Sequence, residues 1–195
     1  MIKKQSDSLM YFDENYQRIS AEEFYNKKIS QGWSSRKVDS LNHRILHPRS
    51  TYGDIENKNF ITTQLERLTG KKVDTTKNIV VIYYPGKDGC NSSARVSRRD
   101  MSYRYKKMER KVNKIAESSF FYIYNDKEGL YEKMDGFREW YQDPDYIFQE
   151  LFFKHHYSCS SFVLISNTGE FITTFGEFSL DEMLESMKFL VSENN

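Results

Sequence analysis

The two cysteines of this chain, Cys90 and Cys159, are the side chains best suited to redox chemistry, because a thiolate is a strong nucleophile. Cys90 lies in the segment NIVVIYYPGKDGCNSS, residues 78–93. Its apolar and aromatic run at 79–84 predicts a strand buried on both faces, and Pro85 and Gly86 end that strand. A short loop then places Cys90 at the predicted start of a long helix. There the positive end of the helix dipole would favour the thiolate.

The cysteine count leaves three interpretations open: a redox couple, a structural bridge, or two unrelated thiols. Two cysteines are too few for a disulfide scaffold, and the chain has no CxxC or Cys/His metal spacing. His43 and His47 are four residues apart, but Pro48 and the lack of helix signals argue against a metal site there. We therefore expect no metal and no cofactor.

Composition narrows the class of protein. A net charge of +1 over 195 residues argues against nucleic-acid binding or membrane binding by the chain as a whole. No apolar run approaches the roughly 18 residues that a membrane span needs. The first residues, MIKKQSDSLMYF, contain no apolar signal-peptide core. We expect a soluble protein, cytoplasmic as the sequence stands, or periplasmic or in the envelope if a signal peptide has been removed.

The periodicity predicts two parts. Residues 1–77 are expected to form an N-terminal extension, helical and irregular, with one helix after the capping box of Ser20 and Glu23 and another at 59–68. From residue 78 onward the pattern alternates as β-α-β-α-β-β-α, with a crossover between the first two strands and a hairpin at the last two. The expected strands are 79–84, 119–124, 161–165 and 170–175. The expected helices are 93–116, one beginning at 143–144, and one from 180 to about 191 that follows a capping box of Ser179 and Glu182.

This order resembles the thioredoxin superfamily over residues 78–195. The stretch YYPGKDGCNSSA is similar to the active-site corner of peroxiredoxins and of bacterial thiol reductases. The stretch SCSSFVLISNTGEF resembles the segment in which those families place a cis-proline, a strand and a turn with Gly. The resemblance implies an α/β fold with a central mixed β-sheet flanked by helices.

The active site departs from the family pattern. Residues 90–93 read CxxS, as in some monothiol glutaredoxins, so Ser93 stands where a local resolving cysteine would be. Lys87 occupies the place of a threonine that peroxiredoxins need. Ser160, or else Cys159, stands at the cis-proline place, and a trans peptide is expected because a non-proline cis bond costs roughly 2.5–4 kcal/mol.

The same resemblance suggests a second thiol for the site. In this fold the residue before the cis-proline faces the active-site cysteine, so with Ser160 at the proline place Cys159 would face Cys90. The hypothesis is that Cys90 is an exposed nucleophile and Cys159 its distant resolving partner. His156 could lower a cysteine pKa, although histidines at a helix end more often cap carbonyls.

Other functions remain open at this stage. Cys90 could be a remnant thiol of a retired active site, and Cys159 a small buried hydrophobe. The chain would then be a redox-inactive binding protein, for instance a bacterial immunity or envelope protein. Its contact surface would be the basic helix 93–116, with nine basic residues against two acidic ones, and the aromatic loop 137–141 with Phe137, Trp140 and Tyr141. The expected partner is a protein thiol, a protein disulfide or a binding protein, with no nucleic acid and an undetermined oligomeric state.

Overall fold

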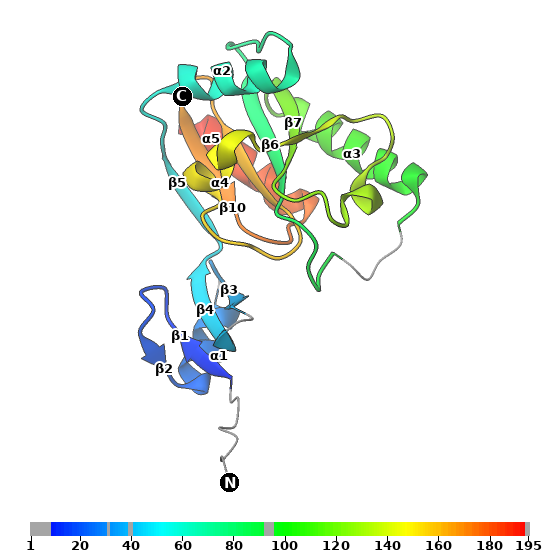
Figure 1. Ribbon diagram of the computed structural model, residues 1–195. Helices are drawn as coiled ribbons and strands as arrows, with labels where there is room; N and C mark the ends of the chain where they lie inside the picture. The colour runs from blue at the N-terminus through cyan, green and yellow to red at the C-terminus, as the bar shows by residue number, and fades with distance from the viewer. Residues whose placement is uncertain (1–8, 31, 39–40, 92–95, 194–195) are drawn as a thin grey trace. The chain divides into compact units, whose positions relative to one another are not determined.

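The computed structural model describes residues 9–30, 32–38, 41–91 and 96–193. The chain divides into two compact units, residues 1–50 and 51–195 (Figure 1). No helix in the described part of the chain combines the length and the apolar character needed to cross a bilayer.

The N-terminal unit is built on a four-stranded sheet in the order β2-β1-β4-β3. β1 and β4 are parallel, and the other two pairs are antiparallel. The capping box predicted for Ser20 and Glu23 is confirmed, and the helix that follows buries Phe24 completely. The elements are β1 (Met10–Phe12), β2 (Arg18–Ile19), α1 (Ala21–Ile29), β3 (Trp33–Val38) and β4 (His43–Pro48).

This sheet corrects the expectation of a helical and irregular extension. The sequence of β3, WSSRKV, has no clean alternation of apolar and polar residues, and nearly all of its residues are half-buried. A strand of that kind leaves little periodic signal, because neither of its faces is a continuous apolar surface.

The larger unit contains a six-stranded sheet in the order β5-β10-β9-β6-β7-β8. β6 runs parallel to β7 and antiparallel to β9, and β9 and β10 form an antiparallel hairpin. Its elements are β5 (Ser50–Asp54), α2 (Lys58–Thr69), β6 (Asn78–Tyr84), α3 (Arg98–Asn113), β7 (Ser118–Tyr124), η2 (Leu130–Lys133), β8 (Trp140–Gln142), η3 (Pro144–Tyr146), α4 (Ile147–Phe152), β9 (Ser161–Ile165), β10 (Glu170–Thr174) and α5 (Leu180–Ser192).

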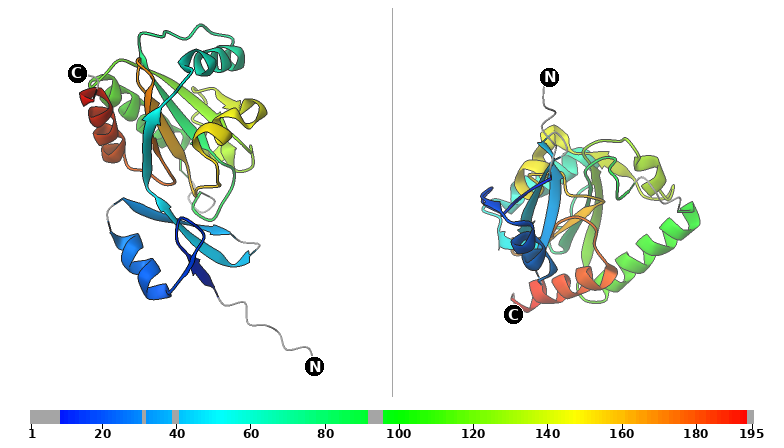
Figure 2. Two further views of the ribbon diagram at one scale, coloured as in Figure 1. Left: turned by 90° about the vertical axis from the view of Figure 1, so that its left-hand side faces the viewer. Right: turned by 90° about the horizontal axis from the view of Figure 1, so that it is seen from below.

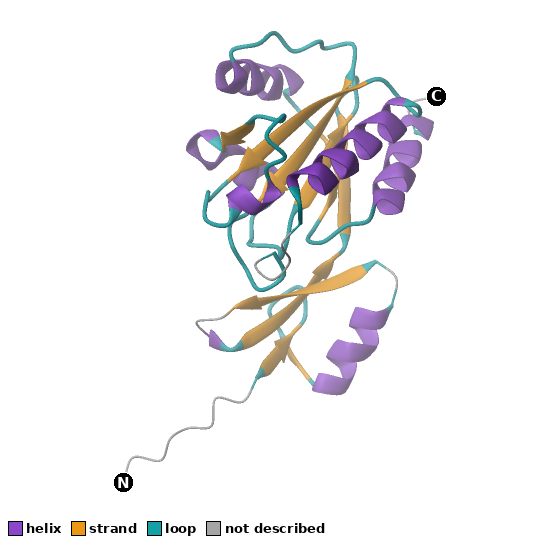
Figure 3. Ribbon diagram, turned by 90° about the vertical axis from the view of Figure 1, so that its right-hand side faces the viewer, coloured by secondary structure: helices purple, strands orange, loops and turns teal. Residues whose placement is uncertain are grey.

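The central part of this unit has a thioredoxin-like α/β fold. Apart from the short strand β8, which was not predicted, the succession β6-α3-β7-α4-β9-β10-α5 is the predicted order of helices and strands, and it forms a mixed sheet flanked by helices. Figures 2 and 3 show α3 and α5 on one face of the sheet and α2 and α4 on the other. The predicted fold class is therefore confirmed for this part of the chain.

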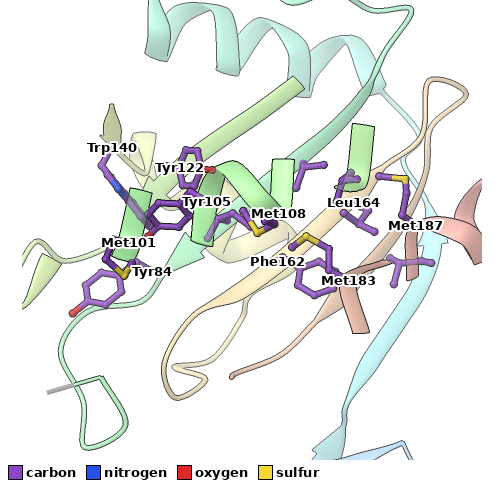
Figure 4. Packing of buried hydrophobic residues seen from close by; sticks show 14 of the residues in the cluster. Tyr84, Met101, Tyr105, Met108, Tyr122, Trp140, Phe162, Leu164, Met183 and Met187 are labelled. Atoms are coloured by element: carbon purple, nitrogen blue, oxygen red, sulfur yellow. The ribbon is translucent and has the colours of Figure 1, made fainter. Parts of the chain in front are cut away.

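Strand β6 is the centre of the core, and all seven of its residues are buried. Val80, Ile82 and Tyr84 join one cluster with residues of α3 and α5, shown in Figure 4. Ile79 and Val81 lie on the opposite face, in a second cluster with residues of α2 and α4. An unbroken apolar strand sequence follows from this arrangement, because both faces of the sheet are covered.

The division at residues 50/51 differs from the predicted boundary at 77/78. Helix α2 packs Ile61 and Leu65 into the same cluster as Ile79 of β6. Strand β5 pairs with β10 at the sheet edge. Residues 51–77 thus belong to the larger unit, although within them the polar linker 71–77 separates α2 from β6 along the sequence.

Candidate functional site

Cys90 and Cys159 form a disulfide, with their Cα atoms 5.3 Å apart. The pairing of neighbouring strands explains this, because Tyr83 near the end of β6 is in register with Ser161 at the start of β9. The loop after β6 and the loop before β9 therefore lie at the same end of these two neighbouring strands. Cys90 is exposed and Cys159 is half-buried. The expected proximity of two cysteines 69 positions apart is confirmed.

The position of Cys90 relative to the following helix differs from the prediction. Helix α3 begins at Arg98, with the hydroxyl of Ser97 accepting a hydrogen bond from the Asp100 N–H. Cys90 lies in a turn eight positions earlier, and residues 92–95 fall outside the described part of the chain. Helix-dipole effects fall off within the first turn, so the dipole of α3 cannot be invoked to stabilise a Cys90 thiolate.

The carboxylate of Asp88 joins the two loops that carry the cysteines. Its Oδ1 accepts hydrogen bonds from the backbone N–H groups of Cys90, at 2.8 Å, and Asn91, at 2.9 Å. Its Oδ2 accepts one from the backbone N–H of Cys159, at 2.8 Å. Sequence reasoning treated Asp88 only as a loop residue. An aspartate two positions before a cysteine in a Gly-containing turn is a recognisable Asx-turn signal, but it says nothing of the distant loop.

Asn91 completes the connection from the interior. Its side chain is almost fully buried and donates to the carbonyl oxygens of Gly86, at 2.9 Å, and Cys159, at 3.4 Å. Its Oδ1 accepts from the Asp88 N–H at 3.0 Å. Asp88 and Asn91 thus bind both the N–H and the C=O of Cys159, and neither interaction involves a sulfur atom.

The backbone of Cys159 has φ = +74°, a left-handed conformation that residues other than glycine rarely adopt. Such a conformation costs on the order of 1–3 kcal/mol and persists only where the surroundings impose it. Here the Cys159 N–H donates to Asp88 and the Cys159 C=O accepts from Asn91, and these hydrogen bonds hold the residue in that conformation. Every peptide bond in the described residues is trans, including the one before Ser160.

The three supporting residues expected from the sequence have different outcomes. His156 is half exposed, and its Nε2 lies 3.1 Å from Asp88 Oδ2, so it contacts the carboxylate that joins the loops. Ser160 links Cys159 to β9 and is half-buried. Ser93 lies outside the described residues.

Glu177 is a site residue that sequence reasoning missed. Its Oε2 lies 3.9 Å from Cys90 Sγ, and one donor atom from each of Glu177, Cys90 and Cys159 lies within 4.8 Å of the other two. Glu177 follows Gly176, which turns the chain with φ = +77° just beyond β10. No spacing in the sequence relates residue 177 to residues 90 and 159, so the fold alone brings them together.

The basic surface predicted on the helix after β6 is present on α3. Arg99, Arg104 and Lys107 make no ion pair with another described residue. A groove of 690 Å³ runs between α3 and the segment that contains Phe137, whose side chain is 77% exposed. Its lining includes Arg98, Arg99, Ser102, Tyr103, Lys106 and Phe137.

Only part of the predicted aromatic loop is on the surface. Phe137 is exposed, but Trp140 is buried against Tyr105 and Tyr122. Tyr141 is half-buried. Trp140 is therefore a core residue, which corrects its expected role in a contact surface.

A buried ionic cluster attaches this loop to α3. Arg138 donates to Glu109, with its Nε 2.7 Å from Oε1, and it also pairs with Asp135. The Asp135 side chain is fully buried, and that of Arg138 is 12% exposed. Burial alone would raise the pKa of Asp135, but the backbone N–H groups of Phe137 and Arg138 and the Arg138 guanidinium together lower it.

The sequence matches no protein-family model and no curated protein. Among solved structures, the chain is similar to the bacterioferritin comigratory protein of Xanthomonas campestris, which was studied for alkyl peroxide reduction. The two are 13% identical, the match covers 63% of this chain and 86% of that one, and the TM-score is 0.43. A structure of Xanthomonas campestris peroxiredoxin Q has the same identity and TM-score and is covered to 88%. A secreted disulfide oxidoreductase of Mycobacterium tuberculosis is 12% identical over 57% of this chain and 81% of its own, with a TM-score of 0.36. At these identities the likeness concerns the fold.

Proposed function

We propose that the Cys90–Cys159 disulfide is redox-active and that the protein exchanges thiols and disulfides with a protein substrate. The observation that carries this proposal is that Cys90 is an exposed residue in a disulfide beyond the end of the central strand β6, between two loops that are also joined without the S–S bond. A bridge that serves only stability needs neither an accessible sulfur nor a second connection between its loops.

The chemistry follows from the different exposure of the two cysteines, Cys90 being exposed and Cys159 half-buried. A substrate thiolate attacks the exposed Cys90 sulfur, the S–S bond breaks, and Cys159 leaves as a thiolate. A second substrate thiolate then attacks the substrate sulfur of the mixed disulfide and releases Cys90 as a thiolate. The substrate dithiol loses two electrons and becomes a disulfide, and the protein gains them. In the reverse direction Cys90 attacks a substrate disulfide and Cys159 resolves the mixed disulfide.

The role of Asp88 and Asn91 in this scheme is to keep the thiols adjacent after reduction. Their hydrogen bonds go to backbone groups of Cys90 and Cys159, so they do not depend on the S–S bond. Holding two reacting groups together replaces a bimolecular step with an intramolecular one. Cys159 therefore acts as a resolving thiol although it is distant in sequence, which compensates for the serine at position 93.

Trapping experiments test the proposal directly. Reduced Cys159→Ser protein, mixed with a peptide that contains one disulfide, should accumulate a mixed disulfide through Cys90, detectable by mass spectrometry. Wild-type protein should release a reduced peptide, and Cys90→Ser should do neither. The Cys90→Ser/Cys159→Ser double variant is the control for background exchange. Peptide reduction by the double variant at the wild-type rate would refute the proposal.

A redox-inactive binding function is the second candidate, and the groove beside α3 supports it. The groove combines exposed aromatic rings, Tyr103 and Phe137, with the cations Arg99 and Lys106, which make no ion pair with a described residue. Asp135 also lines the groove, and its carboxylate pairs with Arg138. Such a surface suits an acidic polypeptide. Fluorescence anisotropy with labelled poly-glutamate tests this: Arg99→Glu and Lys106→Glu should abolish binding, and equal binding by these variants and the wild type would reject it.

A further inference from the structure

The carboxylate of Glu177 lies beside the Cys90–Cys159 disulfide. The sulfurs of a disulfide carry no proton, so Cys90 Sγ has nothing to donate to the oxygen 3.9 Å away. The situation changes when the bond is reduced, because two thiols then lie next to a carboxylate. All three side chains end in atoms that bind metal ions, and these atoms lie within 4.8 Å of one another.

The distances suit a tetrahedral zinc ion. Zinc takes cysteine sulfur at about 2.3 Å and carboxylate oxygen at about 2.0–2.2 Å, which in tetrahedral geometry places S and O about 3.6 Å apart and the two sulfurs about 3.8 Å apart. The distance from Cys90 Sγ to Glu177 Oε2 is within a few tenths of an ångström of that requirement. The two sulfurs must separate by nearly 2 Å from the roughly 2.05 Å of a covalent S–S bond. Rotation about the two Cα–Cβ bonds can provide this without moving the backbone.

We propose that the reduced protein binds zinc through Cys90, Cys159 and Glu177, and that the bound zinc withholds both thiolates from exchange. This inference rests on the proposed function only in requiring that the disulfide can be reduced. Binding converts two thiols into thiolate ligands and releases two protons, and water takes the fourth position. When an oxidant such as a disulfide accepts two electrons from the pair, the S–S bond forms again and the zinc is released.

The donor set selects the metal and the redox state. Thiolate ligands favour zinc over calcium and magnesium, which prefer sets made only of oxygen. In the oxidised protein the sulfurs carry no charge, which leaves a single carboxylate, too little for a metal site. Zinc binding would therefore report the reduced state of the couple. Both Cys90 and Glu177 are exposed, so an ion can reach the site from solvent.

Cobalt titration tests the site, because cobalt(II) replaces zinc and its bonds to thiolates absorb visibly. The full-length protein is reduced with a phosphine, freed of reductant without oxygen, titrated with cobalt and then challenged with zinc. We expect thiolate-to-cobalt absorption that zinc abolishes, and none in the oxidised protein. Glu177→Gln should weaken zinc binding about tenfold or more, the size of effect seen when a supporting metal-site group is removed. The control variant Glu150→Gln removes an exposed carboxylate that lies on α4, and it should bind zinc as the wild type does.

Three results would overturn the inference. The first is equal affinity in the wild type and Glu177→Gln, and the second is unchanged cobalt absorption in the Cys90→Ser/Cys159→Ser variant. The third applies where the zinc-free protein reduces a peptide disulfide: an undiminished rate of that reduction in saturating zinc. The titration needs no substrate, so zinc binding without disulfide exchange would support the metal site while refuting the proposed function.

Discussion

Reducing the Cys90–Cys159 disulfide should destabilise the protein by an amount that the loop length sets. The cross-link closes a loop of 69 residues. In the chain-entropy treatment, a loop of that length removes about 15 cal/mol/K from the unfolded chain, which is about 4.4 kcal/mol at 25 °C. The hydrogen bonds of Asp88 go to the backbone N–H groups of Cys90 and Cys159 and not to the sulfurs, so we expect them and the folded state to be retained on reduction.

The same free energy sets a redox potential by linkage. If the disulfide stabilises the fold by about 4.4 kcal/mol, the fold stabilises the disulfide equally. The reduction potential of the folded protein should then lie about 90 mV below that of the unfolded chain, since 30 mV corresponds to about 1.4 kcal/mol for two electrons.

Equilibrium unfolding in urea measures the effect in three forms: oxidised wild type, phosphine-reduced wild type, and the Cys90→Ser/Cys159→Ser variant. The reduced wild type should lose about 4 kcal/mol. Its m-value should rise, because the open unfolded chain exposes more surface. The double variant is the control and should not respond to the reductant. Equal unfolding free energies for oxidised and reduced wild type would refute the reasoning, since the bridge would then constrain nothing in the unfolded chain.

Two further predictions concern the ionic cluster beside α3. Arg138→Met leaves two carboxylates without their cation and should lower the unfolding free energy in urea by about 3 kcal/mol, the low end for a broken buried pair because Arg138 is partly exposed. The control Arg67→Met removes one partner of an exposed ion pair and should lower it by less than about 1 kcal/mol. Similar losses in the two variants would contradict the assignment of a buried cluster. Because the folded protein lowers the pKa of Asp135, its carboxylate stabilises the fold above the unfolded pKa of about 3.9 and this stabilisation is lost as pH falls through the folded value. Thermal midpoints of the wild type and Asp135→Asn should therefore converge below about pH 4, whereas a gap that is constant or widens on acidification would count against this account.

Features decided by local patterns could be predicted well. The buried run of β6 and the capping boxes at Ser20 and Ser179 are each specified by residues adjacent in sequence, and the structure contains them. The resemblance to the thioredoxin superfamily extended this to the order of elements. It also placed Cys159 opposite Cys90, because strand order in a known fold carries long-range information that periodicity does not.

Features that depend on contacts between distant segments were missed or misplaced. The start of α3 was set too early, because the hydroxyl of Ser97 accepts a hydrogen bond from the Asp100 N–H and so caps the helix at that point. The unit boundary was predicted near residue 77 and lies at residues 50/51. The polar sequence of the linker 71–77 gives no indication that α2, which precedes it, packs on the sheet.

The sequence by itself determined where the central strand lies, which residues begin two of the helices, and that a cysteine follows the strand. These depend on hydrophobic periodicity and on hydrogen bonds that span only a few residues. The resemblance placed Cys159 opposite that cysteine, and the tertiary structure alone decided what else surrounds it: the Asp88 carboxylate that holds both loops, and the carboxylate of Glu177. Residues 90, 159 and 177 approach one another because β6, β9 and β10 are neighbours in the sheet, and a pairing between strands far apart in the chain is not encoded in any single stretch of it.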